Sequence, residues 1–251
     1  MIFDDFKVKA NFITFDKPRL IKALSQSVEV KHNPLNPSDY DRIIDATGVK
    51  RAYLPPNQND LLMSCIQYRV KKKDESDEIK IKLGGVGYAW HFPLGDHVHI
   101  GFGCINDDPA KSYNGTTLAG WKVNEPVCGC KGVVRLSAPG ASIPFVVEGT
   151  PQIWGVGEAI GCVSPLVGDG IVSSMKSVRI LLNNWDDPEG YTNEILREFN
   201  WLDRERKVVD KLANGRPLIL LDARVLLENS RRRMDMRMGF LDVFRMARSF
   251  K

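Results

Sequence analysis

The chain has 251 residues, 43% of them hydrophobic, so it is long enough to bury one large core or two smaller ones. No apolar run approaches the roughly 20 residues that a membrane-spanning helix needs, and the charged residues within the first ten positions are not typical of a signal peptide. We therefore expect a cytoplasmic protein. Its five cysteines, an odd number, indicate reduced thiols and no disulfide framework.

The formal net charge of +4 is concentrated at the C-terminus. Seven basic and two acidic residues lie in positions 229–251, which leaves the rest of the chain near neutral. This distribution argues against a nucleic-acid groove across the body of the protein. The last segment places Phe240, Val243, Phe244 and Ala247 on one face. That face could contact a membrane surface peripherally or pack as part of a C-terminal helix.

The first 60 residues predict four elements with a Pro-containing loop before the last of them. They are extended chain over 1–16, a helix over 17–27, a strand over 28–31 and a buried strand over 42–48. The last strand ends in the sequence Asp45-Ala46-Thr47-Gly48, which predicts a tight exit from the strand.

Six short, glycine-containing segments follow and predict an antiparallel sheet. They cover residues 61–70, 79–83, 87–92, 97–103, 132–136 and 143–148. In the third of them, Tyr88, Trp90 and Phe92 alternate along the chain and Pro93 follows. Residues two apart in a strand share one face, so the three rings could form a wall for a long apolar chain. The alternative is a sheet face packed as core.

Residues 152–185 predict a strand, a glycine-rich loop and a helix. Glu158 follows the strand directly, where its carboxylate could accept hydrogen bonds from a ribose hydroxyl. Gly168 and Gly170 flank Asp169 immediately before a helix that begins at Ile171. Glycine allows close approach of the backbone, and the free N–H groups at a helix start favour an anion. The alternative is an ordinary strand-loop-helix connection with glycine at its turns.

The predicted helix that begins at residue 171 is amphipathic. Its apolar positions are 171, 172, 175, 178, 181 and 182, and the opposite face carries serine, lysine and arginine. Two further helices are expected over 191–213 and 218–227.

The cysteines and histidines do not predict a metal site. Cys128 and Cys130 share one face of a strand or turn, but the other cysteines are scattered along the chain. The cysteines could be redox-active thiols, Cys162 among them, or small buried core residues, and both interpretations remain open. His97 and His99 also share a strand face, without a carboxylate or third histidine near them in sequence.

Three segments together resemble the geranylgeranyl reductase family of FAD-dependent oxidoreductases. The segment from Gly157-Glu158 to Gly168-Asp169-Gly170-Ile171 is similar to the second FAD-binding motif of that family. The segment Asp45–Gly48 is similar to its DATG element, and the segment Tyr88–Pro93 is similar to its Tyr-x-Trp-x-Phe-Pro pattern. Glu158 stands where the family usually has aspartate, and His99 where it often has asparagine.

The resemblance implies which residues form the site. Cofactor-binding residues would be Asp45, Gly48, Glu158, Gly168, Asp169, Gly170 and Ile171. Substrate-binding residues would be Tyr88, Trp90, Phe92 and Pro93. The cofactor would be FAD, and the substrate an isoprenoid lipid whose carbon–carbon double bonds are reduced. The alternative is a non-catalytic lipid-binding or partner-binding protein that no longer binds flavin.

The expected fold is mixed α/β, with an incomplete FAD-binding Rossmann-like domain over 1–60 and 138–190. An antiparallel sheet for substrate binding would be inserted over 61–137, and a helical region would follow over 191–251. The first βαβ unit of the family, with its Gly-x-Gly-x-x-Gly sequence, does not occur in this chain. A second polypeptide could supply it, the chain could start too far downstream, or the protein could be a remnant that binds no flavin.

Overall fold

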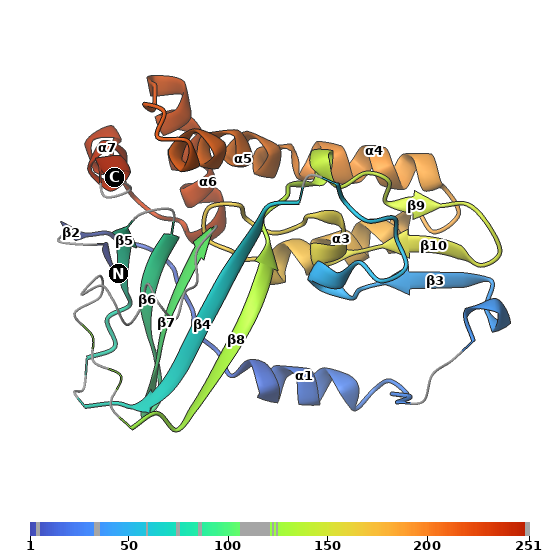
Figure 1. The fold of residues 1–251 in the computed structure, drawn as a ribbon, viewed down its shortest axis with the longest axis horizontal. Coiled ribbons are helices and arrows are strands. Elements are labelled where there is room, and N and C mark those ends of the chain that lie inside the picture. Colours follow the sequence, from blue (N-terminus) through green and yellow to red (C-terminus); the bar gives the residue numbers. More distant parts are fainter. Residues whose placement is uncertain are drawn as a thin grey trace.

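A computed structural model describes residues 1–3, 6–32, 36–58, 60–73, 76–84, 87–105, 121, 123 and 125–248. The fold is mixed α/β, as expected, with one large and one small sheet and most of the helices packed above and beside them (Figure 1). None of the helices in these ranges is long and apolar enough to cross a membrane.

The large sheet has seven strands in the order β2-β1-β5-β6-β7-β4-β8. They are β1 (Ile2–Phe3), β2 (Phe6–Lys7), β4 (Leu62–Lys71), β5 (Lys80–Gly84), β6 (Gly87–Leu94), β7 (His97–Ile105) and β8 (Cys128–Arg135). Every pair is antiparallel except β1 with β5, which confirms the predicted antiparallel sheet. The two N-terminal strands extend one edge of this sheet, although the sequence predicts only extended chain there.

The small sheet has the order β3-β10-β9, from β3 (Arg42–Asp45), β10 (Gln152–Gly155) and β9 (Val146–Val147). β10 pairs in parallel with β3 and antiparallel with β9. The predicted strand over 143–148 is therefore wrong in length and in sheet. Pro144 has no N–H group for a ladder, which limits pairing at the start of this segment.

β3 is an edge strand, so the prediction of a fully buried strand is wrong for part of it. Asp45 is fully buried, but Ile44 is 37% exposed, and no strand within the described ranges pairs with the other edge of β3. The predicted strand over 28–31 is also absent. Val28 and Val30 are exposed there, and neither pairs with a neighbouring strand in the described chain.

Helix α1 (Lys17–Ser25) begins where the sequence predicts, with Asp16 as its N-cap accepting a hydrogen bond of 3.0 Å from the Arg19 N–H. No residue of α1 is buried. Figure 1 shows α1 below β3, away from the other helices.

The other helices cover the two sheets from above and behind in Figure 1. They are α3 (Ile171–Asn183), α4 (Pro188–Glu198), α5 (Asn200–Ala213), α6 (Leu220–Met234) and α7 (Phe240–Arg248). The predicted single helix over 191–213 is thus two, because Phe199 leaves helical geometry between them (φ −104°, ψ 12°). In α7, Val243 is buried and joins a core cluster with α5 and α6, so the packed-helix interpretation holds for that side chain.

The small sheet shares one core with α3, α4 and α5. Trp154 and Tyr191, both fully buried, are in contact through tilted rings whose centroids lie 5.2 Å apart. The Tyr191 hydroxyl donates a 2.6 Å hydrogen bond to the Gly155 carbonyl, which ties α4 to the end of β10. This core fixes the position of the loop that follows β10.

Candidate functional site

Asp45 organises the loop after β3. Its buried carboxylate accepts hydrogen bonds from the N–H and hydroxyl groups of Thr47 (3.0 and 2.6 Å) and from the N–H groups of Tyr53 and Leu54 (2.9 and 3.0 Å). Desolvation raises the pKa of this carboxyl, but the four hydrogen bonds outweigh it and the net pKa is lowered. Asp45 thus acts through the loop that it shapes, since both its oxygens already have protein partners.

Gly48 and Glu158 meet at the carboxyl ends of β3 and β10. Gly48 has φ +66°, and a Cβ atom there would lie 2.9 Å from Glu158 Oε2. Glu158 Oε1 accepts a 2.7 Å hydrogen bond from the Arg135 N–H at the end of β8. Two segments that are 110 residues apart in sequence therefore form one corner, in which Glu158 is half-buried and presents its second oxygen near the glycine backbone.

The glycine-rich loop 161–170 has a fixed internal structure. The Ser164 N–H donates to the Asp169 carbonyl (2.8 Å), and the Gly168 N–H donates to the Ser164 carbonyl (2.9 Å). From the large sheet, the Tyr88 hydroxyl donates a 2.5 Å hydrogen bond to the Val167 carbonyl. Burial raises the pKa of Tyr88, so the phenol stays protonated and can keep this bond.

A buried charged cluster holds the same loop from the other side. The Ser164 hydroxyl donates a 2.6 Å hydrogen bond to Glu205 on α5 and accepts one from Arg233 on α6. Arg233 also forms an ion pair of 3.1 Å with Glu205, which is fully buried. Glu205 and Arg233 could not be recognised from the sequence, because nothing in a helical pattern distinguishes a buried charge from an exposed one.

The start of α3 lies directly after this loop. Asp169 is exposed, Ile171 is 38% exposed, and Gly170 at the N-cap offers no side chain. The first turn of α3 has no acidic residue, so the partial positive charge of the helix start is not compensated within that turn. This end of the helix therefore retains its capacity for an anion.

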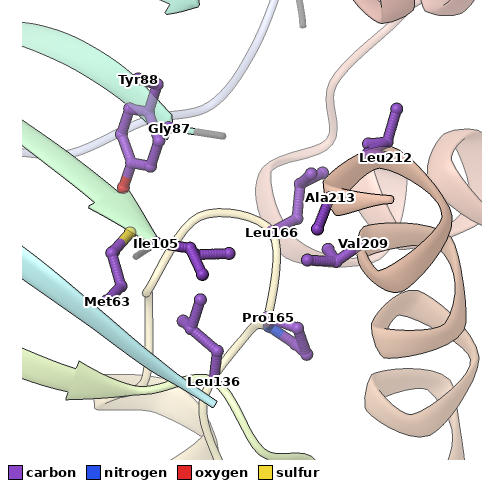
Figure 2. A pocket seen from close by; sticks show the side chains of 10 residues that line it. All are labelled: Met63, Gly87, Tyr88, Ile105, Leu136, Pro165, Leu166, Val209, Leu212 and Ala213. Atoms are coloured by element: carbon purple, nitrogen blue, oxygen red, sulfur yellow. The ribbon is translucent and has the colours of Figure 1, made fainter. Parts of the chain in front are cut away.

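An apolar pocket lies between the large sheet, the glycine-rich loop and α5 (Figure 2). Met63, Tyr88 and Ile105 approach it from the sheet, while Pro165 and Leu166 come from the loop. The remaining lining residues are Gly87, Leu136, Val209, Leu212 and Ala213. Figure 2 shows Val209, Leu212 and Ala213 on the helix opposite the sheet, so the pocket joins three parts of the chain.

The aromatic row of β6 is arranged as the alternation predicts, but only Tyr88 reaches the pocket. The rings of Tyr88 and Trp90 have centroids 5.5 Å apart, and those of Trp90 and Phe92 6.3 Å. Trp90 is 8% exposed and covers Gly101 of β7, where a Cβ atom would lie 2.2 Å from its ring. The Phe92 ring contacts the tilted ring of Phe12, and Pro93 is buried. Core contacts within the chain therefore hold Trp90 and Phe92.

The thiols and histidines differ in burial. Cys162 is fully buried, which raises its pKa, so it packs as a core residue. Burial raises the pKa of Cys65 to about 11, while Cys128 and Cys130 are exposed on β8. Burial lowers the pKa of His99, helped by Arg69. No three potential metal ligands gather in the part of the chain that the structure describes.

Comparison with known proteins gives similarity in structure only. No protein-family model and no curated protein matches the sequence. Xcc4156, a flavin-dependent halogenase from Xanthomonas campestris, has a TM-score of 0.52 at 14% identity over 68% of this chain and 37% of its own. MibH, a lathipeptide tryptophan 5-halogenase, has a TM-score of 0.52 at 13% identity over 85% of this chain and 47% of its own.

A geranylgeranyl bacteriochlorophyll reductase-like protein (Ta0516) from Thermoplasma acidophilum has a TM-score of 0.44 at 20% identity, over 74% of this chain and 55% of its own. The chain spans less than half the length of the two halogenases. At these identities the similarity concerns the fold. The chain therefore shares part of its fold with the two halogenases.

Proposed function

We propose that this chain is a subunit or part of an FAD-dependent oxidoreductase that reduces carbon–carbon double bonds of an isoprenoid lipid. The observation that carries the proposal is the corner at which Gly48 and Glu158 meet, beside the uncompensated start of α3. Two of the three motifs that resemble the geranylgeranyl reductase family thus meet in space, and Tyr88 of the third contacts the glycine-rich loop. The shared fold with flavin-dependent enzymes supports the same proposal.

The residues of this corner suit one part of FAD. Glu158 offers a carboxylate oxygen to a hydroxyl of the ribityl or ribose region, and Gly48 lets that region approach the backbone. The N–H groups at the start of α3 suit the pyrophosphate. Reduced FAD, when bound, supplies a hydride for the double bond. The chain itself would position the cofactor, exclude water and hold the substrate.

The apolar pocket supports a hydrocarbon substrate. Its lining from Met63, Ile105, Leu136 and the glycine-rich loop is apolar and offers dispersion contacts to a hydrocarbon group. The Tyr88 hydroxyl is already bonded to Val167, so its ring faces the pocket as an apolar wall. The protein would work in the cytoplasm, and peripheral contact with a membrane would bring it to a lipid substrate.

The adenosine half of FAD needs a further structural unit, because no Gly-x-Gly-x-x-Gly sequence occurs in this chain. We propose that a second polypeptide supplies it. The purified chain should therefore bind FAD weakly by itself and much more tightly with that polypeptide present.

Titration of FAD, followed by flavin absorbance and fluorescence, tests the proposal. Glu158→Gln should weaken the binding about tenfold, because a neutral amide is a poorer acceptor than a carboxylate. Glu189→Gln, an exposed change on α4, is the matched control and should bind like the wild type. Micromolar or tighter binding by the chain alone would show that no second polypeptide is needed. A chain that takes up no FAD with or without a partner would favour the non-catalytic lipid-binding or partner-binding alternative.

A further inference from the structure

The glycine-rich loop 161–170 joins the apolar pocket to the start of α3. Two of its side chains line the pocket, and its last residue is the N-cap of the helix. Ser164 ties the two ends together. Its N–H donates to the Asp169 carbonyl over 2.8 Å, and its carbonyl accepts from the Gly168 N–H over 2.9 Å. The position of Ser164 therefore sets the positions of both ends of the loop.

A buried ion pair from two C-terminal helices holds the Ser164 hydroxyl. This hydroxyl donates to the Glu205 carboxylate of α5 over 2.6 Å and accepts a hydrogen bond from the Arg233 guanidinium of α6. Arg233 pairs with Glu205 over 3.1 Å, and its side chain is only 7% exposed. The Val167 N–H also donates to the hydroxyl, over 3.3 Å. The single donor and both acceptor positions of the Ser164 hydroxyl are thus in use.

The neighbours of this ion pair fix its geometry. The Asn229 side-chain amide is buried and donates to the Trp201 carbonyl over 3.1 Å and to Glu205 over 3.4 Å. The Arg233 guanidinium lies 5.9 Å from the centre of the Trp201 ring, within the range of a cation–π contact. Movement of either charge would leave the other unpaired in a buried site, which is costly.

Tyr88 of the large sheet holds the same loop from the opposite side. Its hydroxyl donates to the Val167 carbonyl over 2.5 Å, whereas the Val167 N–H points to Ser164. Burial raises the pKa of Tyr88 and the Arg233 guanidinium opposes the rise, so the cation is near enough to act on the phenol. The loop is therefore clamped between β6 on one side and α5 and α6 on the other.

A buried ion pair contributes little to the stability of a fold. Removing two charges from water costs free energy that their attraction returns only in part, and apolar side chains of similar size often keep or raise stability in their place. The other buried residues of α5 are apolar, so an apolar side chain would suit the position of Glu205 as well. The ion pair instead supplies direction, because a donor and an acceptor together hold a hydroxyl in one orientation.

We propose that Glu205 and Arg233 are positioning residues: they hold the Ser164 hydroxyl and thereby set the loop that leads to the free N–H groups at the start of α3. Helices α5 and α6 thus adjust the anion-binding end of the site, although neither supplies one of these N–H groups. This inference rests on the proposed function, since the anion that the helix start would bind is the pyrophosphate of FAD.

Two variants of the full chain test this role. The double variant E205M/R233M replaces the ion pair by apolar side chains of similar length, and Ser164→Ala keeps the ion pair but removes its link to the loop. Both should speed amide hydrogen exchange of Val167 and Gly168 at least about tenfold, because the loop opens more often. Both should also weaken the binding of FAD and of inorganic pyrophosphate about tenfold, without contact to either ligand.

The double variant should unfold at a urea midpoint close to that of the wild type, because apolar side chains of similar size replace the buried charges. The matched control is R224M/E228M, which removes an exposed Arg–Glu ion pair on the same helix α6. This control should leave the exchange of the loop amides, the two affinities and the urea midpoint unchanged.

Several results would overturn the positioning role. They are loop amides that exchange as in the wild type, equally fast exchange in the control, unchanged affinities despite faster exchange, and a double variant with a much lower urea midpoint. The two ligands keep this inference separate from the flavin function. A wild-type chain that binds pyrophosphate but no FAD refutes the flavin function, and the pyrophosphate affinities of the variants then decide the positioning role. A chain that binds FAD equally well in all variants has the reverse meaning.

Discussion

Helices α3 and α5 have nearly the same length and both carry an apolar stripe, yet the protein covers only one of them. α5 buries Trp201, Leu202, Val208 and Val209, the apolar side expected of a packed helix. α3 buries two serines and two apolar residues, and it exposes five apolar residues. The contrast teaches that an apolar stripe predicts a contact but does not say which chain provides it. Within the described residues, the apolar side of α5 is covered, and the exposed apolar residues of α3 are not.

Trp90→Ala, in β6 of the large sheet, should have the largest effect on the free energy of unfolding. The buried ring covers Gly101 and contacts two neighbouring aromatic residues, so its loss should lower the free energy of unfolding by about 4 kcal/mol. Urea unfolding measures this change. Tyr88→Phe is the control, which keeps a ring in the same row and removes only the bond to Val167, at a cost of about 1 kcal/mol. A loss below about 1 kcal/mol for Trp90→Ala would instead identify the ring as a pocket wall with few permanent partners.

Leu202→Ala tests the covered stripe of α5. Leu202 is fully buried in the core that α5 shares with the small sheet, so truncation should cost about 3 kcal/mol in unfolding free energy. The exposed Leu182→Ala in α3 is the matched change and should cost less than about 0.5 kcal/mol. Equal losses for the two leucines would remove the distinction between the helices.

Asp45→Asn tests the hydrogen bonds of the loop after β3 and should lower the free energy of unfolding by about 2 kcal/mol at pH 7. An amide cannot accept all four hydrogen bonds of the loop. Because the pKa of Asp45 is lowered in the folded state, its contribution is fully present above its unfolded pKa of about 3.9 and is lost as pH falls through the folded pKa. Unfolding at several pH values should therefore show the wild type and variant converging below about pH 4. A difference that does not shrink there would contradict the assigned hydrogen bonds.

Met175→Glu should have the smallest effect on the free energy of unfolding, and it compares α3 with α5 directly. Met175 is 66% exposed, so the isolated chain should keep its unfolding free energy within about 0.5 kcal/mol. The equivalent change on α5, Val208→Glu, buries a charge and should prevent stable folding. Circular dichroism and thermal unfolding report both. A destabilisation above about 2 kcal/mol for Met175→Glu would mean that this chain, or a second copy of it, already covers the stripe.

The sequence by itself determined the elements whose signals are local. Alternation placed Tyr88, Trp90 and Phe92 on one face of β6, and the helix expected from residue 17 begins there as α1. The antiparallel sheet, the strand before Glu158 and the helix at Ile171 followed from periods of two and 3.6 residues. Such periods depend only on neighbours along the chain, which is why they could be read without a structure.

Only the tertiary structure decided which surfaces those elements share. It brought Gly48 to Glu158, placed Ser164 between Glu205 and Arg233, and added β1 and β2 to the large sheet. It also turned the serine side of α3 inward, because the Gly157 N–H needed the Ser177 hydroxyl and the close approach excluded larger side chains. These outcomes depend on contacts between residues far apart in sequence, and a local pattern contains no information about the partner on the other side.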